Sequence, residues 1–251
     1  MKDTIYTIPL TEAFQEKGEC PFCFIYRKLE QDAISFTLGC SYMEMDFREQ
    51  TDKAGFCTLH YQKLYDYGNR LGLCLILNTH YKVLYETINN ILSENTLPTY
   101  SFFARLKKTS TESNSISTQI DNQLNSCFLC DRIEKDLSRY VSTFFYLWNK
   151  QSEFKNLYEN SKGLCITHFS RLIKDAPLYL NEEQTKEFFE LSKRLLMDSL
   201  KRIEQDLDWF IVKHDHNNKD KPWNNAQDAI PRAIQKLAGI YPQDPIFKED
   251  L

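Results

Sequence analysis

The chain has 251 residues, of which 42% are hydrophobic and 26% charged, and its formal net charge is -4. This length allows one large or two small domains with a buried core, and the mean hydropathy of -0.51 is typical of a soluble protein. The acidic balance argues against nucleic acid as a partner, because binding to a phosphate backbone draws on an excess of Lys and Arg.

No segment has the properties of a membrane span or a signal peptide. The most apolar run, LGLCLIL over 71–77, is far shorter than the roughly 20 residues that a membrane span needs. The N-terminal residues have no apolar core of the kind found in signal peptides. We therefore expect a cytoplasmic protein without a membrane partner, in which the eight cysteines are free thiols or metal ligands.

The first half of the chain shows a helical pattern with few glycines and prolines. We expect a helix that starts at Cys20 and a short return helix over 41–52, followed by a turn at Gly55. A third helix is expected from Cys57 and a fourth over 70–93. The first repeat of the chain is thus predicted to contain four helices.

A polar segment over 107–125 follows, rich in Ser, Thr and Asn and poor in large apolar residues, and we predict a flexible linker there. The helical pattern then resumes. Pro177 is expected to end one helix and Asn181 to cap the next, with Glu182 and Glu183 in its first turn. That last helix is long and amphipathic.

Two motifs occur twice at nearly constant spacing. A Cys-x-x-Cys is followed by a Cys-x-x-His, and both return 107 or 108 positions later: Cys20 and Cys23 with Cys57 and His60, then Cys127 and Cys130 with Cys165 and His168. This recurrence predicts an internal duplication. We assign the repeats to 1–106 and 126–212, the linker to 107–125 and a C-terminal tail to 213–251.

Each repeat offers three thiols and one imidazole, a ligand set that suits tetrahedral zinc. Two ligands three residues apart at the start of a helix can point at one ion. A helix that leads away from the Cys-x-x-Cys and a second helix that returns would bring the Cys-x-x-His of the same repeat beside it. We therefore predict one zinc ion within each repeat and two per chain. Four strong ligands leave no open position, which indicates structural rather than catalytic zinc.

Alternatives remain at this point. The cysteines could be small buried thiols, or the ligands could hold an iron–sulfur cluster. Charged residues beside the motifs, Glu19 and Asp131, are expected to be solvated or to cap helices, and we assign no catalytic residue. The unpaired Cys40 and Cys74 are predicted to lie in the core.

The C-terminal tail either docks a partner or wraps back over the helical bundle, and we favour the second interpretation. It contains a short amphipathic helix after Asp228, with Ile234 and Leu237 on one face.

The segments ECPFC, GFCTLH, YGNRLGL, GLCITHF and NKDKPWNNAQDAIPRAIQKL resemble those of a family of bacterial proteins defined only as a domain of unknown function. The resemblance covers most of the chain and implies the same eight metal ligands. It also implies a turn at Asn224, where family members often have Gly, and Asn tolerates the left-handed backbone of such a turn. It implies no activity.

These observations predict an all-α protein of two duplicated helical repeats, each cross-linked by its own zinc ion, with a short C-terminal helical tail. The function we expect is that of a cytoplasmic scaffold for protein interaction or regulation. A thiol-based redox or metal sensor, or an iron–sulfur protein, is the alternative. An enzymatic function is not favoured.

Overall fold

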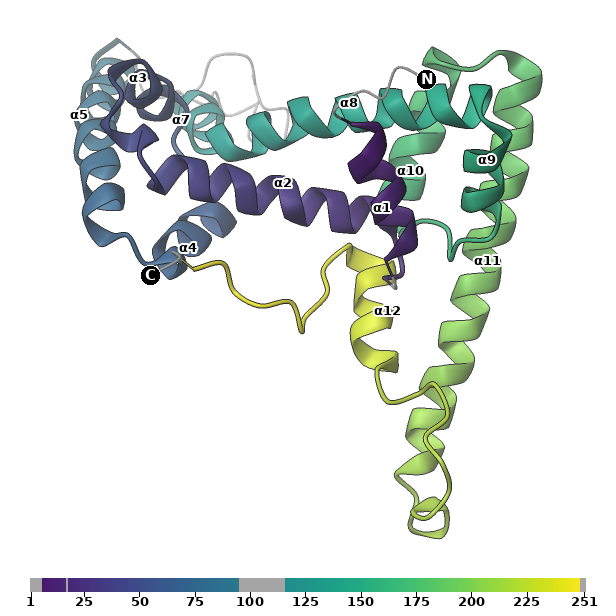
Figure 1. Cartoon of the computed structure of the whole chain (residues 1–251). Helices are drawn as coiled ribbons and strands as arrows, with labels where there is room; N and C mark the ends of the chain where they lie inside the picture. Colours follow the sequence, from purple (N-terminus) through teal and green to yellow (C-terminus); the bar gives the residue numbers. More distant parts are fainter. Residues whose placement is uncertain (1–5, 17, 95–115, 249–251) are drawn as a thin grey trace, which may run out of the picture. The chain divides into compact units, whose positions relative to one another are not determined.

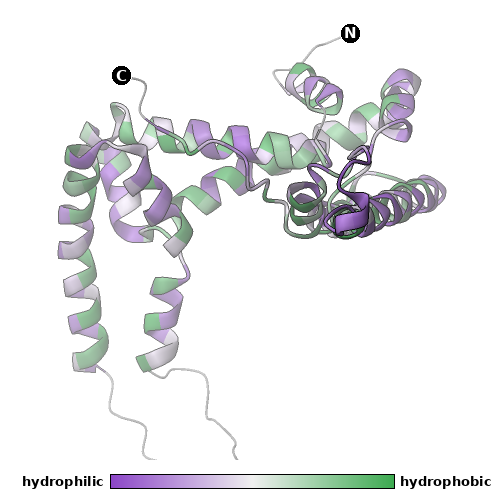
Figure 2. Ribbon diagram, turned by 90° about the horizontal axis from the view of Figure 1, so that it is seen from below, coloured by the Kyte–Doolittle hydropathy of each residue, from purple (hydrophilic) through white to green (hydrophobic). Residues whose placement is uncertain are grey.

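The computed structural model describes residues 6–16, 18–94 and 116–248, and every regular element in these ranges is a helix (Figure 1). The all-α prediction is therefore confirmed. Figure 2 shows hydrophobic and hydrophilic residues mixed along the helices. Among the described residues, no helix is both long enough and apolar enough to cross a membrane.

The chain divides into two compact units. The first unit consists of Met1–Leu29 and Lys135–Pro245, and the second of Glu30–Glu134 and Ile246–Leu251. Helix α2 (Pro21–Leu38) begins in the first unit and ends in the second, whereas α8 (Phe128–Lys150) begins in the second and ends in the first. Each unit therefore contains one end of both helices.

The first unit is built around a cluster of aromatic side chains. Its other elements are α1 (Thr7–Gln15), α9 (Ser152–Glu159), α10 (Ile166–Asp175), η2 (Ala176–Leu178), α11 (Glu182–Lys213), η3 (His216–Asn218) and α12 (Ala229–Ala238). Phe144 of α8 is fully buried, and its ring centroid lies 5.3 to 6.1 Å from those of Phe14, Tyr158, Phe154 and Phe188. These contacts bury large apolar side chains from α1, α8, α9 and α11 in one core.

The sequence signals at the start of α11 are confirmed. The side chain of Asn181 accepts a hydrogen bond from the backbone N–H of Gln184, whose own side chain accepts one from the N–H of Asn181. This reciprocal capping box satisfies backbone donors that the helix leaves free. Glu182 and Glu183 lie in the first turn, as expected.

The tail wraps back over the first unit, as we favoured. Helix α12 packs against α10 and α11, and Figure 1 shows it alongside α11. Asn224 has a φ of 53°, the left-handed conformation expected of the turn there.

The second unit has its own buried core. Its remaining elements are η1 (Ser41–Met43), α3 (Met45–Ala54), α4 (Thr58–Tyr67), α5 (Arg70–Glu94) and α7 (Ile116–Leu124). Helix α3 packs on α5, where Thr79 donates a hydrogen bond of 2.7 Å to the carboxylate of Asp52. Fully buried apolar residues of this unit include Ile34, Leu38, Leu64 and Ile76.

The predicted linker is in part a helix. Residues 107–115 lie outside the described residues, whereas 116–124 form α7, a helix that we did not predict. Ile116, Ile120 and Gln123 are half-buried at helical spacing, and α7 packs against α5. The polar composition concealed this short amphipathic pattern.

Cys40 and Cys74 are exposed, so the prediction that they lie in the core is wrong. Cys40 lies in a turn that follows α2. Cys74 lies on the outward face of α5, in an open groove of about 920 Å³ that Tyr81 and Tyr85 also line. Apolar periodicity along α5 does not by itself show which of its faces is covered.

Candidate metal sites

The eight predicted ligands come together in two groups of four, but the pairs are exchanged between the repeats. Site 1 consists of Cys20, Cys23, Cys165 and His168, and site 2 of Cys57, His60, Cys127 and Cys130. In each group, all donor atoms lie within 4.8 Å of one another. The prediction that each repeat holds its own metal ion is therefore wrong, because every group combines one pair from 1–106 with one pair from 126–212.

The helix lengths explain the exchange. Helix α2 has 18 residues and is about 27 Å long at 1.5 Å per residue, whereas the return helix α3 has 10 residues and spans about 15 Å. The return helix therefore cannot bring Cys57 back to the start of α2. Instead, His60 lies beside Glu30, about two turns beyond Cys23 on α2.

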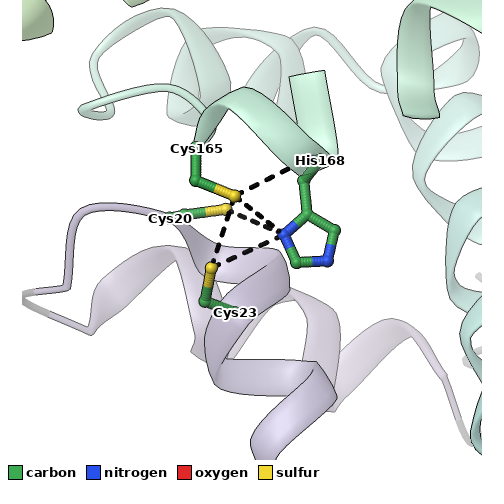
Figure 3. Close-up of side chains that lie close together, drawn as sticks. All are labelled: Cys20, Cys23, Cys165 and His168. Carbon is green, nitrogen blue, oxygen red and sulfur yellow. Dashed lines mark hydrogen bonds between the residues drawn. The ribbon is translucent and has the colours of Figure 1, made fainter. Parts of the chain in front are cut away.

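The donor atoms fit a single tetrahedral ion in both sites. With Zn–S bonds of about 2.3 Å and a Zn–N bond of about 2.0–2.1 Å, a tetrahedron separates two sulfurs by about 3.8 Å and a sulfur from the nitrogen by about 3.6 Å. In site 1, the three sulfurs lie 3.2–3.5 Å from Nδ1 of His168, and those of Cys23 and Cys165 are 3.5 Å apart (Figure 3). The three sulfurs of site 2 lie 3.2–3.4 Å from Nδ1 of the imidazole. The three thiols and one imidazole of each group could thus hold one metal ion.

Each pair of ligands stands at the beginning of a helix. Cys57 and Cys165 are the N-cap residues of α4 and α10, while Cys20 and Cys127 directly precede α2 and α8. The second ligand follows three residues later, in the first turn. Helix N-termini offer positive potential and free N–H groups, which favour thiolate over thiol.

A glycine with positive φ precedes each Cys-x-x-His. Gly55 has a φ of 58° and Gly163 of 71°, two residues before Cys57 and Cys165. A Cβ atom added to Gly163 would lie 2.9 Å from the Cβ of Leu195. Both the backbone conformation and the close approach of α11 therefore require glycine there.

In site 1 without metal, the thiol of Cys20 and the imidazole of His168 shift each other's pKa in opposite directions. Burial disfavours the thiolate of Cys20, but hydrogen bonds with Cys165, Cys23 and His168 lower its pKa well below the ordinary value. Burial also disfavours the charged form of His168, yet its contacts with Cys165 and Cys20 raise the pKa of this imidazole to about 10. Metal binding at neutral pH must therefore displace protons from the site.

The C-terminal helix covers site 1. The ammonium group of Lys236, which is 1% exposed, donates to the backbone carbonyls of Glu19, Lys162 and Leu164. Glu19 directly precedes Cys20, and Leu164 directly precedes the other ligand pair. One buried side chain thus joins the two segments that carry the ligands.

Gly239, at the end of α12, completes this cover. A Cβ atom added to it would lie 3.6 Å from the sulfur of Cys23 and 3.8 Å from that of Cys165. The backbone of the tail thus lies directly over two of the four ligands.

Glu19 is neither solvated nor a cap, contrary to our expectation. It is 1% exposed, and its carboxylate lies 2.6 Å from Arg202, 3.3 Å from Lys162 and 3.6 Å from Lys236. Burial raises the pKa of this carboxyl, but Arg202 and the lysines lower it more, so the net shift is downward. Asp131, in contrast, is exposed in the first turn of α8.

Site 2 has a carboxylate behind its imidazole. Nε2 of His60 lies 3.3 Å from Glu30, which also pairs with Lys63. Burial disfavours the charged form of His60, but contacts with Cys127 and Glu30 raise its pKa to about 10. Because Nδ1 faces the sulfurs, Nε2 is the nitrogen that faces Glu30, and a carboxylate in this place orients many metal-binding histidines.

The thiols of site 2 are less uniformly buried. Burial raises the pKa of Cys127, but the hydrogen bond with His60 lowers it to about 6 overall. Cys127 and His60 are buried, whereas Cys57 and Cys130 are half-buried. The N–H of Phe128 donates to the carbonyl of Gly55, so the two ligand-bearing segments also meet through the backbone.

All eight residues of the two groups were predictable from the sequence, but the residues that support them were not. Glu30, Lys63 and Lys236 looked like ordinary surface charges of amphipathic helices. The tail segment that contains Lys236 resembles a recurring family segment, which could have drawn attention to this residue. The sequence does not show, however, which groups Lys236 contacts.

A protein family matches almost the whole chain. Residues 1–244 match the model described as "Family of unknown function (DUF6062)". Neither the curated proteins nor the solved structures contain a match. The chain belongs to this family, and the resemblance seen in its motifs is confirmed.

Proposed function

We propose that this family member is a cytoplasmic zinc-binding protein with two structural sites of three cysteines and one histidine, and that it serves as a scaffold for protein interaction or regulation. The observation that supports zinc most directly is the convergence of four donor atoms in each group. Thiolate and imidazole are ligands that zinc prefers, and a tetrahedron is its usual geometry in structural sites.

The spacing of the donor atoms favours one ion over an iron–sulfur cluster. Sulfur–nitrogen separations of 3.2–3.5 Å surround a space that one metal ion fills. A cluster places several irons and bridging sulfides between its cysteines, so its ligands must stand farther apart. We therefore propose zinc at both sites.

Closed coordination supports a scaffold rather than an enzyme. Each group already supplies four protein ligands, so a bound ion keeps no position for water or substrate. The face of α5 that other described elements leave uncovered has exposed aromatic side chains, Tyr81 at 66% and Tyr85 at 70%. Aromatic residues are enriched where proteins contact one another, which supports a protein as the partner.

A repeated unit with its own ligand pairs supports the proposed duplication. Both halves place a long helix after the Cys-x-x-Cys, a shorter helix next, and a third helix after the Cys-x-x-His. The zinc ions then join the two repeats to each other, because each site takes ligands from both.

Elemental analysis of protein purified without oxygen tests the proposal. We expect two zinc ions per chain and a colourless solution. Iron with inorganic sulfide and visible absorbance would contradict the zinc assignment. For the scaffold role, a purified partner should bind the zinc-loaded chain and lose binding after chelation; binding that does not depend on zinc would contradict that role.

A further inference from the structure

We propose that Cys57 and Cys130 of site 2 form the oxidation-sensitive pair of this protein, and that a hydroperoxide converts them to a disulfide while site 1 stays reduced. This inference rests on the proposed zinc sites, because the consequence of oxidation is that site 2 loses two zinc ligands and releases its ion. It assigns a sensing role to one site and a structural role to the other.

The distance between sulfurs does not distinguish the sites. The sulfurs of Cys57 and Cys130 are 3.8 Å apart in site 2, and those of Cys23 and Cys165 are 3.5 Å apart in site 1. Either pair could move to the disulfide length of about 2.05 Å. Access of the oxidant must therefore decide which pair reacts.

Site 1 is closed to an oxidant. All four of its ligands are buried, Cys165 completely. Helix α12 lies over it, with Gly239 against two sulfurs and the buried ammonium of Lys236 bound to carbonyls beside both ligand pairs. A peroxide molecule can reach these thiols only after α12 separates from α10, which is a local unfolding event.

Site 2 is open on one side. Cys57 and Cys130 are half-buried, whereas Cys127 and His60 are buried behind them. The sulfurs of these two half-buried residues are also direct neighbours at 3.8 Å. Solvent therefore meets an attacking thiol and a resolving thiol together, as in redox-sensing cysteine pairs.

The reaction balances with hydrogen peroxide as the oxidant. One thiolate, at Cys57 or Cys130, attacks a peroxide oxygen; the O–O bond breaks, hydroxide leaves and a sulfenic acid remains. The second thiolate attacks that sulfur, the S–O bond breaks and a second hydroxide leaves. Two sulfurs lose two electrons in total, and one peroxide becomes two hydroxide ions, which are protonated to water.

The oxidised site 2 keeps only two of its four donor atoms, Cys127 and His60. Two ligands hold zinc far less tightly than four, so the ion leaves. A thiol reductant restores the pair, because a disulfide is reversible on the oxidation ladder of cysteine.

The experiment treats the full-length, zinc-loaded protein with increasing hydrogen peroxide and measures two quantities. A metal-binding dye follows zinc release, and mass spectrometry of alkylated peptides maps each thiol. We expect the zinc of site 2 to leave at least about tenfold faster than the zinc of site 1. A tenfold difference in rate corresponds to a free energy of about 1.4 kcal/mol for the local opening of site 1. Peptides that contain Cys57 and Cys130 should become disulfide-linked, and dithiothreitol should reverse this.

Exposed thiols and one variant serve as controls. Cys40 and Cys74 report whether the oxidant reaches surface thiols at each dose. Lys236→Met removes the buried ammonium over site 1 and should accelerate release of the second zinc without changing the first. The inference is wrong if both ions leave together, if site 1 oxidises first, or if Cys57 and Cys130 stay reduced while Cys40 and Cys74 are modified. A preparation without zinc would contradict the proposed function instead, and thiol mapping would still test the inference.

Discussion

Two double variants distinguish exchanged ligand pairs from pairs that meet within one repeat. Cys20 and Cys165 belong to the same site in the structure, whereas Cys20 and Cys57 belong to different sites. Cys20→Ser with Cys165→Ser should therefore destroy one site and leave the other complete. Cys20→Ser with Cys57→Ser should remove one ligand from each site.

The expected difference is large. The free energy of zinc binding to a structural site is about 10–16 kcal/mol, which is about 2.5–4 kcal/mol for each of four ligands. The loss of one thiolate should therefore lower zinc affinity roughly a hundred- to a thousandfold. A chelator whose strength lies between the complete and the three-ligand site then separates the variants. Cys20→Ser with Cys165→Ser should keep one chelator-resistant zinc, and Cys20→Ser with Cys57→Ser should keep none.

The measurement is zinc per chain after dialysis against that chelator. The wild type should keep two ions, and so should Cys40→Ser with Cys74→Ser, because these thiols are exposed and belong to neither group. The opposite pattern, one resistant zinc in Cys20→Ser with Cys57→Ser and none in Cys20→Ser with Cys165→Ser, would refute the exchanged pairing.

Further predictions concern stability and pH. Lys236→Met leaves the buried carbonyls of Glu19 and Leu164 without this donor, while that of Lys162 keeps the hydroxyl of Ser199. The free energy of unfolding should fall by about 3–5 kcal/mol. Urea unfolding at a fixed excess of zinc measures this free energy. The control is Lys186→Met at an exposed position, which should change the free energy of unfolding by less than about 0.5 kcal/mol. Both Gly163→Ala and Gly68→Ala place a side chain at positive φ, and for Gly68, whose Cβ would meet no neighbouring atom, this should lower the free energy of unfolding by about 1–2 kcal/mol. Gly163→Ala should lower it further, because its Cβ also clashes with Leu195. Equal losses of stability in thermal unfolding would contradict the close approach of α11. Because the pKa of His168 is about 10 in the metal-free site, zinc must displace its proton at neutral pH. Zinc affinity should therefore rise with pH up to about 10, by about tenfold per unit for each displaced proton, and a titration that shows no pH dependence would contradict this.

Local features of the chain were predictable because short-range chemistry determines them. The helix beginning at Arg70, the cap at Asn181 and the turn at Gly55 each depend on residues within a few positions of one another. The eight candidate ligands were recognisable for the same reason, since two residues at i and i+3 face one side of a helix start. Half-buried α7 was missed because its apolar side is only two isoleucines wide.

The partners of buried charges could not be predicted. Lys236 contacts Glu19 across more than 200 residues of chain, and Glu30 meets His60 from another helix. Nothing in a single sequence separates these residues from the solvated charges of other helices. Their burial follows from how α12 and α4 pack.

The sequence alone determined the helical fold, the identity of the ligand pairs and their number, because periodicity and spacing are properties of neighbouring residues. Only the tertiary structure decided which pairs share a site. A return helix about 15 Å long cannot retrace an outgoing helix of about 27 Å, so each Cys-x-x-His meets the Cys-x-x-Cys of the other repeat. The same packing placed α12 over site 1 and left two thiols of site 2 accessible.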